Sequence, residues 1–193
     1  FFDELNRCGE KLQNALLQAL QERVVTIGSY NVDFEANFIF MATMNPEDSS
    51  TETVSTVLMD RFDVAYMEYP ETQEYEEQIA DTVAQKLITV PPDVRRQIVM
   101  FVRELRDVDK LERLPSVRAT IGLYERSQTQ AMLKGKDKVS WEDVQKVLVS
   151  VLSHRIKLKP SAEYLQSPQN FLKQKIAEFV EKQGLAKEAG EVP

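Results

Sequence analysis

The chain has 193 residues, of which 42% are hydrophobic and 28% are charged, so it can bury a core in one or two soluble domains. Its formal net charge of −7 argues against a dedicated nucleic-acid binder, which usually presents a basic face. The longest apolar runs fall short of the roughly 18 residues of a membrane helix, and the single cysteine, Cys8, cannot form an internal disulfide, so a cytoplasmic protein without membrane insertion is expected.

The first elements in chain order are a helix and a hairpin. Lys11 to Glu22 repeats leucine at every fourth position, with alanine and leucine beside it, which predicts an amphipathic helix. Val24 to Phe34 follows with a β-rich run, a turn at Gly28-Ser29 and alternating apolar residues. This pattern predicts a β-hairpin.

A buried strand is expected next. Phe38 to Ala42 is nearly all apolar, which is typical of a central parallel strand that is covered on both faces. A short helix over Val54 to Met59 and a strand from Val64, ended by Pro70, complete this part of the chain. Residues 1–70 are therefore expected to form part of an α/β layer with an incomplete parallel sheet.

The second half of the chain is predicted to be helical. Ser140 fits a helix N-cap with Asp143 three residues later, in place of the usual glutamate of a capping box. We expect an all-α domain over residues 71–156, then a last helix and a frayed tail over 157–193. The predicted helices cover Glu71 to Ile88, Pro92 to Asp107, Ser116 to Leu133, Ser140 to Leu152 and Pro168 to Gln183.

Two acidic residues and an amide are candidates for phosphoryl-transfer chemistry. Asp3 could hold a Mg²⁺ shell and Glu4 could polarise an attacking water, although most acidic pairs are simply solvated. Asn45 follows the buried run, at the sheet edge where open α/β sheets bind ligands. A neutral amide there can orient a water or a terminal phosphate, and the alternative is an ordinary Asn-Pro turn.

Arginines follow at two further positions. The planar guanidinium of Arg61 or Arg118 suits the charge on a transferring phosphoryl group, supplied within a subunit or by its neighbour. Taken singly, each is more often a surface salt-bridge partner. Arg118 is the less ordinary of the two, because it begins an otherwise apolar helix just after Pro115.

The order and spacing of these elements resemble the MoxR-type AAA+ ATPases over most of residues 1–156. No single motif carries the resemblance, and the hairpin matches the insertion before sensor 1 that marks this branch of AAA+ proteins. The segments that carry it are FFDELNR, KLQNALLQALQE, the hairpin, FMATMNP, LMDRFD, SVRAT and VLSHRI.

The resemblance implies a role for each candidate residue. Asp3 and Glu4 correspond to Walker B and Asn45 corresponds to sensor 1. Arg61 corresponds to the arginine finger, and Arg118 to the sensor 2 arginine of the helical lid, where the family's small-Pro-Arg signature reads Ser-Val-Arg. The implied cofactors are ATP and Mg²⁺, and the implied assembly is a homo-oligomeric ring, a hexamer, that remodels protein clients.

The phosphate loop of such ATPases is absent from the sequence. No glycine begins the spacing G-x-x-x-x-G-K-[ST], whose backbone amides and lysine cradle the phosphates. We therefore expect the carboxyl-terminal portion of an ATPase, inactive by itself. Two other interpretations stay open: a non-hydrolysing interaction module that uses the helical domain, and a nucleic-acid motor with the same insertion, which the acidic charge disfavours.

Overall fold

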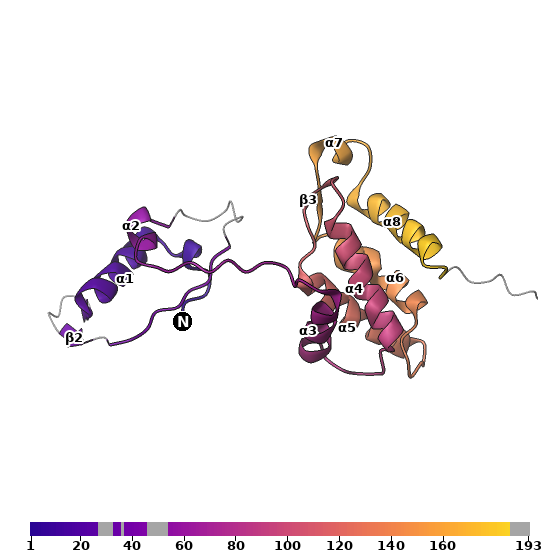
Figure 1. The fold of residues 1–193 in the computed structure, drawn as a ribbon, viewed down its shortest axis with the longest axis horizontal. Helices are drawn as coiled ribbons and strands as arrows, with labels where there is room; N and C mark the ends of the chain where they lie inside the picture. Colours follow the sequence, from indigo (N-terminus) through magenta and orange to yellow (C-terminus); the bar gives the residue numbers. More distant parts are fainter. Residues whose placement is uncertain (27–32, 36, 46–53, 186–193) are drawn as a thin grey trace, which may run out of the picture. The chain divides into compact units, whose positions relative to one another are not determined.

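The computed structural model describes residues 1–26, 33–35, 37–45 and 54–185. The chain divides into two compact units, residues 1–66 and residues 67–193 (Figure 1). The predicted turn at Gly28-Ser29 and the predicted frayed tail lie outside the described residues, apart from the start of the tail. None of the helices in the described ranges combines the length and apolarity needed to cross a membrane.

The first unit contains the predicted helix and hairpin. Helix α1 covers Glu10–Glu22, close to the predicted bounds. The residue that caps its end, Arg23, has a left-handed backbone conformation. Strands β1 (Val24–Thr26) and β2 (Asp33–Glu35) pair antiparallel, which confirms the hairpin. A 3₁₀ turn, η1 (Leu5–Arg7), and a short helix, α2 (Thr56–Met59), complete the regular elements of this unit.

The expected central strand is present only as an isolated parallel bridge between Phe2 and Ala42. The predicted burial of Phe38 to Ala42 is wrong: Ile39 is 87% exposed and Met41 is 60% exposed. A parallel strand is covered on both faces only when further strands and helices pack against it. The expected strand from Val64 to Pro70 is also wrong, since these residues are extended but pair with no other described segment.

A small apolar cluster holds the first unit together. Leu58 of α2 is fully buried against Leu5 of η1 and Cys8, with Phe40 and Phe62 stacked at a ring distance of 5.6 Å beside them. Buried Gln13 of α1 joins the segments, because its amide donates to the carbonyl of Cys8 and accepts from the backbone of Ser55. This cluster positions the turn that follows the acidic pair.

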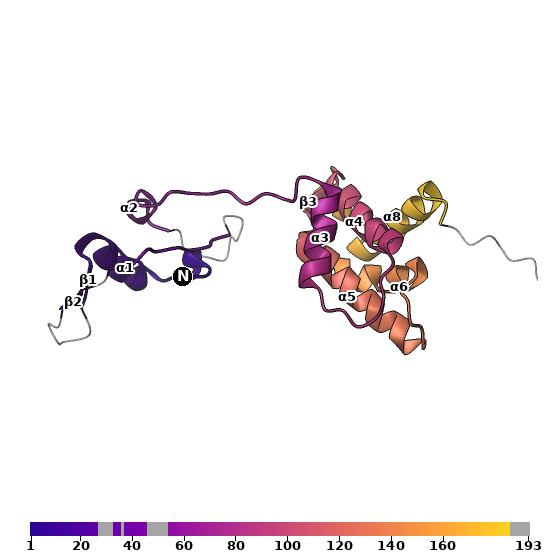
Figure 2. The same cartoon turned by 60° about the horizontal axis from the view of Figure 1, so that its bottom comes forward.

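The second unit is a helical bundle with one small antiparallel ribbon (Figures 1 and 2). Helices α5 and α6 pack along each other, α3 and α4 pack against α5, and α8 packs on α6. The helical character predicted for the second half of the chain is thus confirmed. Its helices are α3 (Gln73–Val83), α4 (Pro92–Arg106), α5 (Val117–Leu133), α6 (Trp141–Leu152), α7 (Pro160–Glu163) and α8 (Pro168–Lys182).

Local capping chemistry explains why several helices start where the sequence predicts. At α6 the hydroxyl of Ser140 and the carboxylate of Asp143 form the predicted capping box. The first predicted helix of this unit is longer than α3, which begins after its N-cap Thr72 and ends at Val83. The ribbon of β3 (Leu111–Arg113) and β4 (Lys157–Leu158) was not predicted from the sequence.

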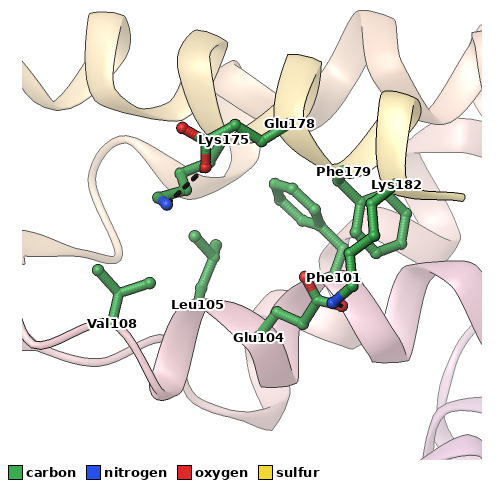
Figure 3. Close-up of a pocket in the computed structure, with 8 residues that line it drawn as sticks. All are labelled: Phe101, Glu104, Leu105, Val108, Lys175, Glu178, Phe179 and Lys182. Carbon is green, nitrogen blue, oxygen red and sulfur yellow. Dashed lines mark hydrogen bonds and ion pairs between the residues drawn. The ribbon is translucent and has the colours of Figure 1, made fainter.

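Aromatic residues join α4 to α8. The ring of Phe101 meets that of Phe179 edge-on, with centroids 5.2 Å apart. Figure 3 shows the shallow groove above this contact, where Lys175 pairs with Glu178, and Lys182 of α8 pairs with Glu104 of α4 at 2.7 Å. The apolar floor and charged rim are typical of two amphipathic helices packed side by side.

A buried glutamine fastens the connection between α3 and α4. Both ends of the Gln128 amide are satisfied: its oxygen accepts from the backbone amides of Leu87 and Ile88, and its nitrogen donates to the carbonyls of Gln85 and Tyr124. A fully buried amide is tolerated only when it is hydrogen-bonded in this way. The loop therefore has one defined position on α5.

Candidate functional site

The acidic pair lies where two extended segments run parallel. The amide of Phe2 donates to the carbonyl of Met41 at 2.8 Å, and the amide of Thr43 donates to the carbonyl of Phe2 at 3.0 Å. One residue after the acidic pair, the amide of Leu5 donates to the carbonyl of Thr43 at 2.8 Å. Both segments therefore end side by side, as the sequence predicts for the carboxyl edge of a parallel sheet.

The side chain of Thr43 ties the two acidic residues to the second segment. Its hydroxyl donates to the carboxylate of Asp3 and accepts from the backbone amide of Glu4 at 3.1 Å. Sequence reasoning missed this threonine. The signal available was a hydroxyl at the end of the apolar run, immediately before the turn that contains Asn45.

Glu4 has an unusual backbone conformation. With φ at 57° and ψ at 56° it lies in the left-handed region, where a residue with a Cβ is disfavoured. Such residues cost about 1–3 kcal/mol and cluster at functional sites. Its side chain is exposed and pairs with Arg7 at 3.0 Å, so the carboxylate is held on the solvent side of the turn.

Asn45 is brought to the same end of the segments. The buried side chain of Asn6 donates from Nδ2 to the carbonyl oxygen of Asn45 at 2.9 Å. This contact links the turn after the acidic pair to the residue after Met44. The structure thus places the side chains of Asp3, Glu4 and Asn45 on one connected framework, and all three are exposed.

Arg61 follows α2 in the same unit and is exposed. Its guanidinium donates to the carbonyl of Val57, one helical turn earlier, and lies beside the amide of Gln21 of α1. Within the described residues it forms no ion pair with Asp60 or Asp63, the alternative partners that its sequence suggests. Its charge is therefore not neutralised by these neighbouring carboxylates.

Arg118 is the second residue of α5, in the helical unit. Its side chain is exposed and forms no hydrogen bond or ion pair with the described part of the chain. The N-cap Ser116 makes no side-chain capping bond, so no Ser116 hydroxyl contact occupies the amides of this first turn. An arginine beside a helix N-terminus forms a cationic position that favours anions.

A buried ionic cluster lies directly under the start of α5. Glu76 of α3 is fully buried and accepts two 2.7 Å hydrogen bonds from the guanidinium of Arg106. The hydroxyl of Thr120 donates to the same carboxylate at 2.6 Å, and Arg103 lies 3.5 Å from it. Sequence reasoning missed this cluster, because a single glutamate in a polar helix looks like a surface residue.

Burial raises the pKa of Glu76, but hydrogen bonds from Arg106 and Thr120 and the charges of Arg106 and Arg103 outweigh it, so the pKa lies below its ordinary value of 4.5. Burial also raises the pKa of Asp143, but hydrogen bonds from Lys134, Lys136 and Ser140 lower it by more. The pKa of Asp143 therefore also lies below its ordinary value. Each carboxylate binds fewer protons in the folded than in the unfolded chain. Both therefore stabilise the fold above their ordinary pKa values.

We expect the helical unit to lose this stabilisation as the pH falls below about 4.5. Thermal unfolding between pH 7 and pH 3, followed by circular dichroism, measures the loss. The Glu76→Gln variant should be less stable at pH 7 and should lose less on acidification than the unmodified chain. Glu163→Gln, at an exposed site, is the control and should follow the unmodified chain; equal acid losses in all three proteins would contradict the prediction.

The donors around Asp3 fit a hydrated Mg²⁺ ion. A carboxylate and a hydroxyl are the hard oxygen groups that Mg²⁺ prefers, and the ion usually keeps several waters. The phosphate-binding half of a nucleotide site has no counterpart in this sequence, because the sequence contains no phosphate-loop spacing. The described residues thus offer hard oxygen groups beside Asp3, while the sequence has no phosphate-loop spacing.

Comparison with known proteins agrees with this arrangement. The family model described as "ATPase family associated with various cellular activities (AAA)" matches residues 1–64, and the "AAA lid domain" model matches residues 113–174. The chain therefore matches AAA+ ATPases in two parts, a partial α/β core over residues 1–64 and a helical lid domain over residues 113–174.

One of its curated relatives is named as a MoxR protein. The chain is 29% identical to "Chaperone MoxR1" of Mycobacterium tuberculosis over 81% of its own length and 50% of that protein. It is also 29% identical to "Uncharacterized protein YeaC" of Bacillus subtilis, over 84% of this chain and 58% of that protein. The chain thus spans about half the length of the curated relatives it matches, and the resemblance inferred from the sequence is confirmed.

One solved structure is also similar. A putative ATPase from Cytophaga hutchinsonii aligns with a TM-score of 0.42 and 24% identity, covering 91% of this chain and 64% of that one.

Proposed function

We propose that the chain is the carboxyl-terminal portion of a MoxR-type ATPase that couples ATP binding and hydrolysis to remodelling of protein complexes. The observation that carries the proposal is the Thr43 hydroxyl, which joins the Asp3 carboxylate to the Glu4 backbone at the end of two parallel segments. That geometry is suited to a Walker B pair, with one acid for the metal and one for water.

Each residue of the acidic edge then has a separate task. Asp3 holds the water shell of Mg²⁺, which, when bound, neutralises charge on the phosphates. Glu4 accepts a proton from the attacking water, since its carboxylate is exposed beyond the metal-side acid. Asn45, as sensor 1, orients that water or the terminal phosphate through its neutral amide.

The two arginines supply positive charge. Arg61 acts as the arginine finger, supported by the absence of a neutralising ion pair with the neighbouring aspartates. Arg118 acts as sensor 2 from the first turn of α5, where its charge and the helix N-terminus both favour phosphate.

The protein is proposed to work as a homo-oligomeric ring, a hexamer, in the cytoplasm, with protein clients and without nucleic acid. Support comes from the relative that is named a chaperone, from the single cysteine and from the acidic net charge. A ring also explains how an arginine of one subunit can complete the site of the next.

Turnover of Mg-ATP tests the proposal. The full-length protein should hydrolyse ATP, whereas the 193-residue chain should release phosphate only at the background rate, because its sequence lacks the phosphate loop that cradles the β- and γ-phosphates. The 193-residue chain with Glu4→Gln defines that background. Phosphate release by the 193-residue chain that disappears in this variant would contradict the proposed split of the site, and a full-length protein that binds clients without hydrolysing ATP would favour the interaction module.

A further inference from the structure

The segment that enters the helical unit is anchored by two arginines of α4. Arg103 donates to the carbonyls of Pro70 and Glu71 at 2.8 Å and 3.0 Å. The guanidinium carbon of Arg106 lies 4.4 Å from the centre of the Tyr69 ring, a cation–π contact. Residues 69–71 lie near the start of the helical unit, which begins at Met67, so these contacts anchor the first residues of that unit to α4.

Arg106 also holds the start of α5. Its Nε donates to the carbonyl of Pro115 at 2.9 Å, three residues before Arg118. Thr120, two residues after Arg118, donates its hydroxyl to Glu76 at 2.6 Å. The backbone that carries Arg118 is therefore fixed on both sides by one cluster.

Glu76 is the centre of that cluster. Its carboxylate is fully buried and accepts from Arg106 and Thr120, and its charge also faces Arg103 at 3.5 Å. Arg106 is itself only 8% exposed. Without the carboxylate, a buried guanidinium would be left unpaired, and it would have to shift toward water and away from its other contacts.

We propose that Glu76 is a positioning residue for Arg118. Through Arg106 and Thr120 it fixes the first turn of α5 relative to the entering segment 69–71, so that Arg118 meets the nucleotide phosphate from a defined place. This inference rests on the proposed function, in which Arg118 acts as sensor 2. It adds a buried carboxylate, remote from any phosphate contact, to the residues on which turnover depends.

A double-mutant cycle in the full-length protein tests the connection. Glu76→Gln should lower ATP turnover about tenfold when Arg118 is present, and by less than about twofold in the Arg118→Ala background, because the positioned group is then absent. Thr120→Val, which removes only the hydroxyl, should lower ATP turnover by a smaller factor. This loss should likewise depend on the presence of Arg118. Loss by the same factor in both backgrounds would overturn the proposal.

Asp143→Asn is the matched control. Asp143 is also a fully buried carboxylate with two cationic partners, Lys134 and Lys136, but it caps α6 and touches neither Arg118 nor segment 69–71. Asp143→Asn should change ATP turnover by the same factor with Arg118 present and in the Arg118→Ala background, as expected of a general loss of stability.

Hydrogen exchange of the 193-residue chain, read by mass spectrometry, tests the anchoring without ATP. Glu76→Gln should speed exchange about tenfold at the first hydrogen-bonded amides of α3 and α5, those of Tyr75, Glu76 and Ala119, whereas Asp143→Asn should speed it around α6 instead. Unchanged exchange at these amides would overturn the positioning role. A full-length protein without ATP turnover, but with the expected exchange, would refute the proposed function while retaining the anchor.

Discussion

Replacing Glu4 by glutamine in the full-length protein is expected to lower ATP turnover on the order of 10²–10⁴-fold, because the amide cannot accept a proton from the attacking water. Glutamine has nearly the same shape and meets the same left-handed backbone cost, so the turn should be kept. The lost ion pair with Arg7 is exposed and worth under about 1 kcal/mol. Nucleotide binding should therefore persist. Binding is measured with a fluorescent ATP analogue, and turnover is measured in parallel as phosphate release.

Glu10→Gln supplies the control, since Glu10 is an exposed acid in the first turn of α1, a few residues further along the same unit. It should hydrolyse ATP at the unmodified rate. Should Glu4→Gln turn over as fast as Glu10→Gln, the water-activating role of Glu4 would be wrong. Loss of nucleotide binding together with turnover would point to damage of the site rather than to loss of a base.

The helices of the second unit were predictable because their signals are local. The capping residues Ser140 and Asp143 lie three positions apart, and Pro92 and Pro168 mark the first turns of α4 and α8. Strand burial is different, since it depends on neighbours far away in the chain. Ile39 reads as a core residue, yet here it is exposed because the described segments include no strand or helix that covers it.

The short ribbon was missed for a similar reason. Leu111 pairs with Leu158 across a long stretch of chain, and strands of two or three residues leave no periodic pattern. The expected strand that begins at Val64 failed because its apolar residues have no strand to pair with among the described residues. Non-local pairing is not encoded in a window of a few residues.

In the candidate site, the acidic edge could be inferred but its connections could not. Asp3 and Asn45 each follow an apolar run, which predicts the carboxyl edge of a sheet. Thr43 and Asn6 join them through hydrogen bonds that only the fold reveals. Glu76 could not be inferred at all, because its partners Arg106 and Thr120 lie on two other helices and its own stretch of sequence is polar.

Arg61→Ala in the full-length protein is expected to reduce ATP turnover on the order of 10³-fold, the effect of removing an arginine finger. Arg61 is exposed just after α2, and the resemblance to AAA+ rings places this residue against the nucleotide of the next subunit. A surface role would cost under about 1 kcal/mol of stability and leave turnover unchanged. Arg126→Ala, at an exposed position on α5, is the matched control and should retain full turnover.

Mixing two inactive variants separates action across a boundary from action within one subunit. In a ring that combines Arg61→Ala with Glu4→Gln subunits, some boundaries join an intact Glu4 on one side to an intact Arg61 on the other. Those sites should regain turnover, because each is completed by its neighbour. If hybrid rings form, as native mass spectrometry can establish, and the mixture remains as inactive as its components, then Arg61 does not act in trans.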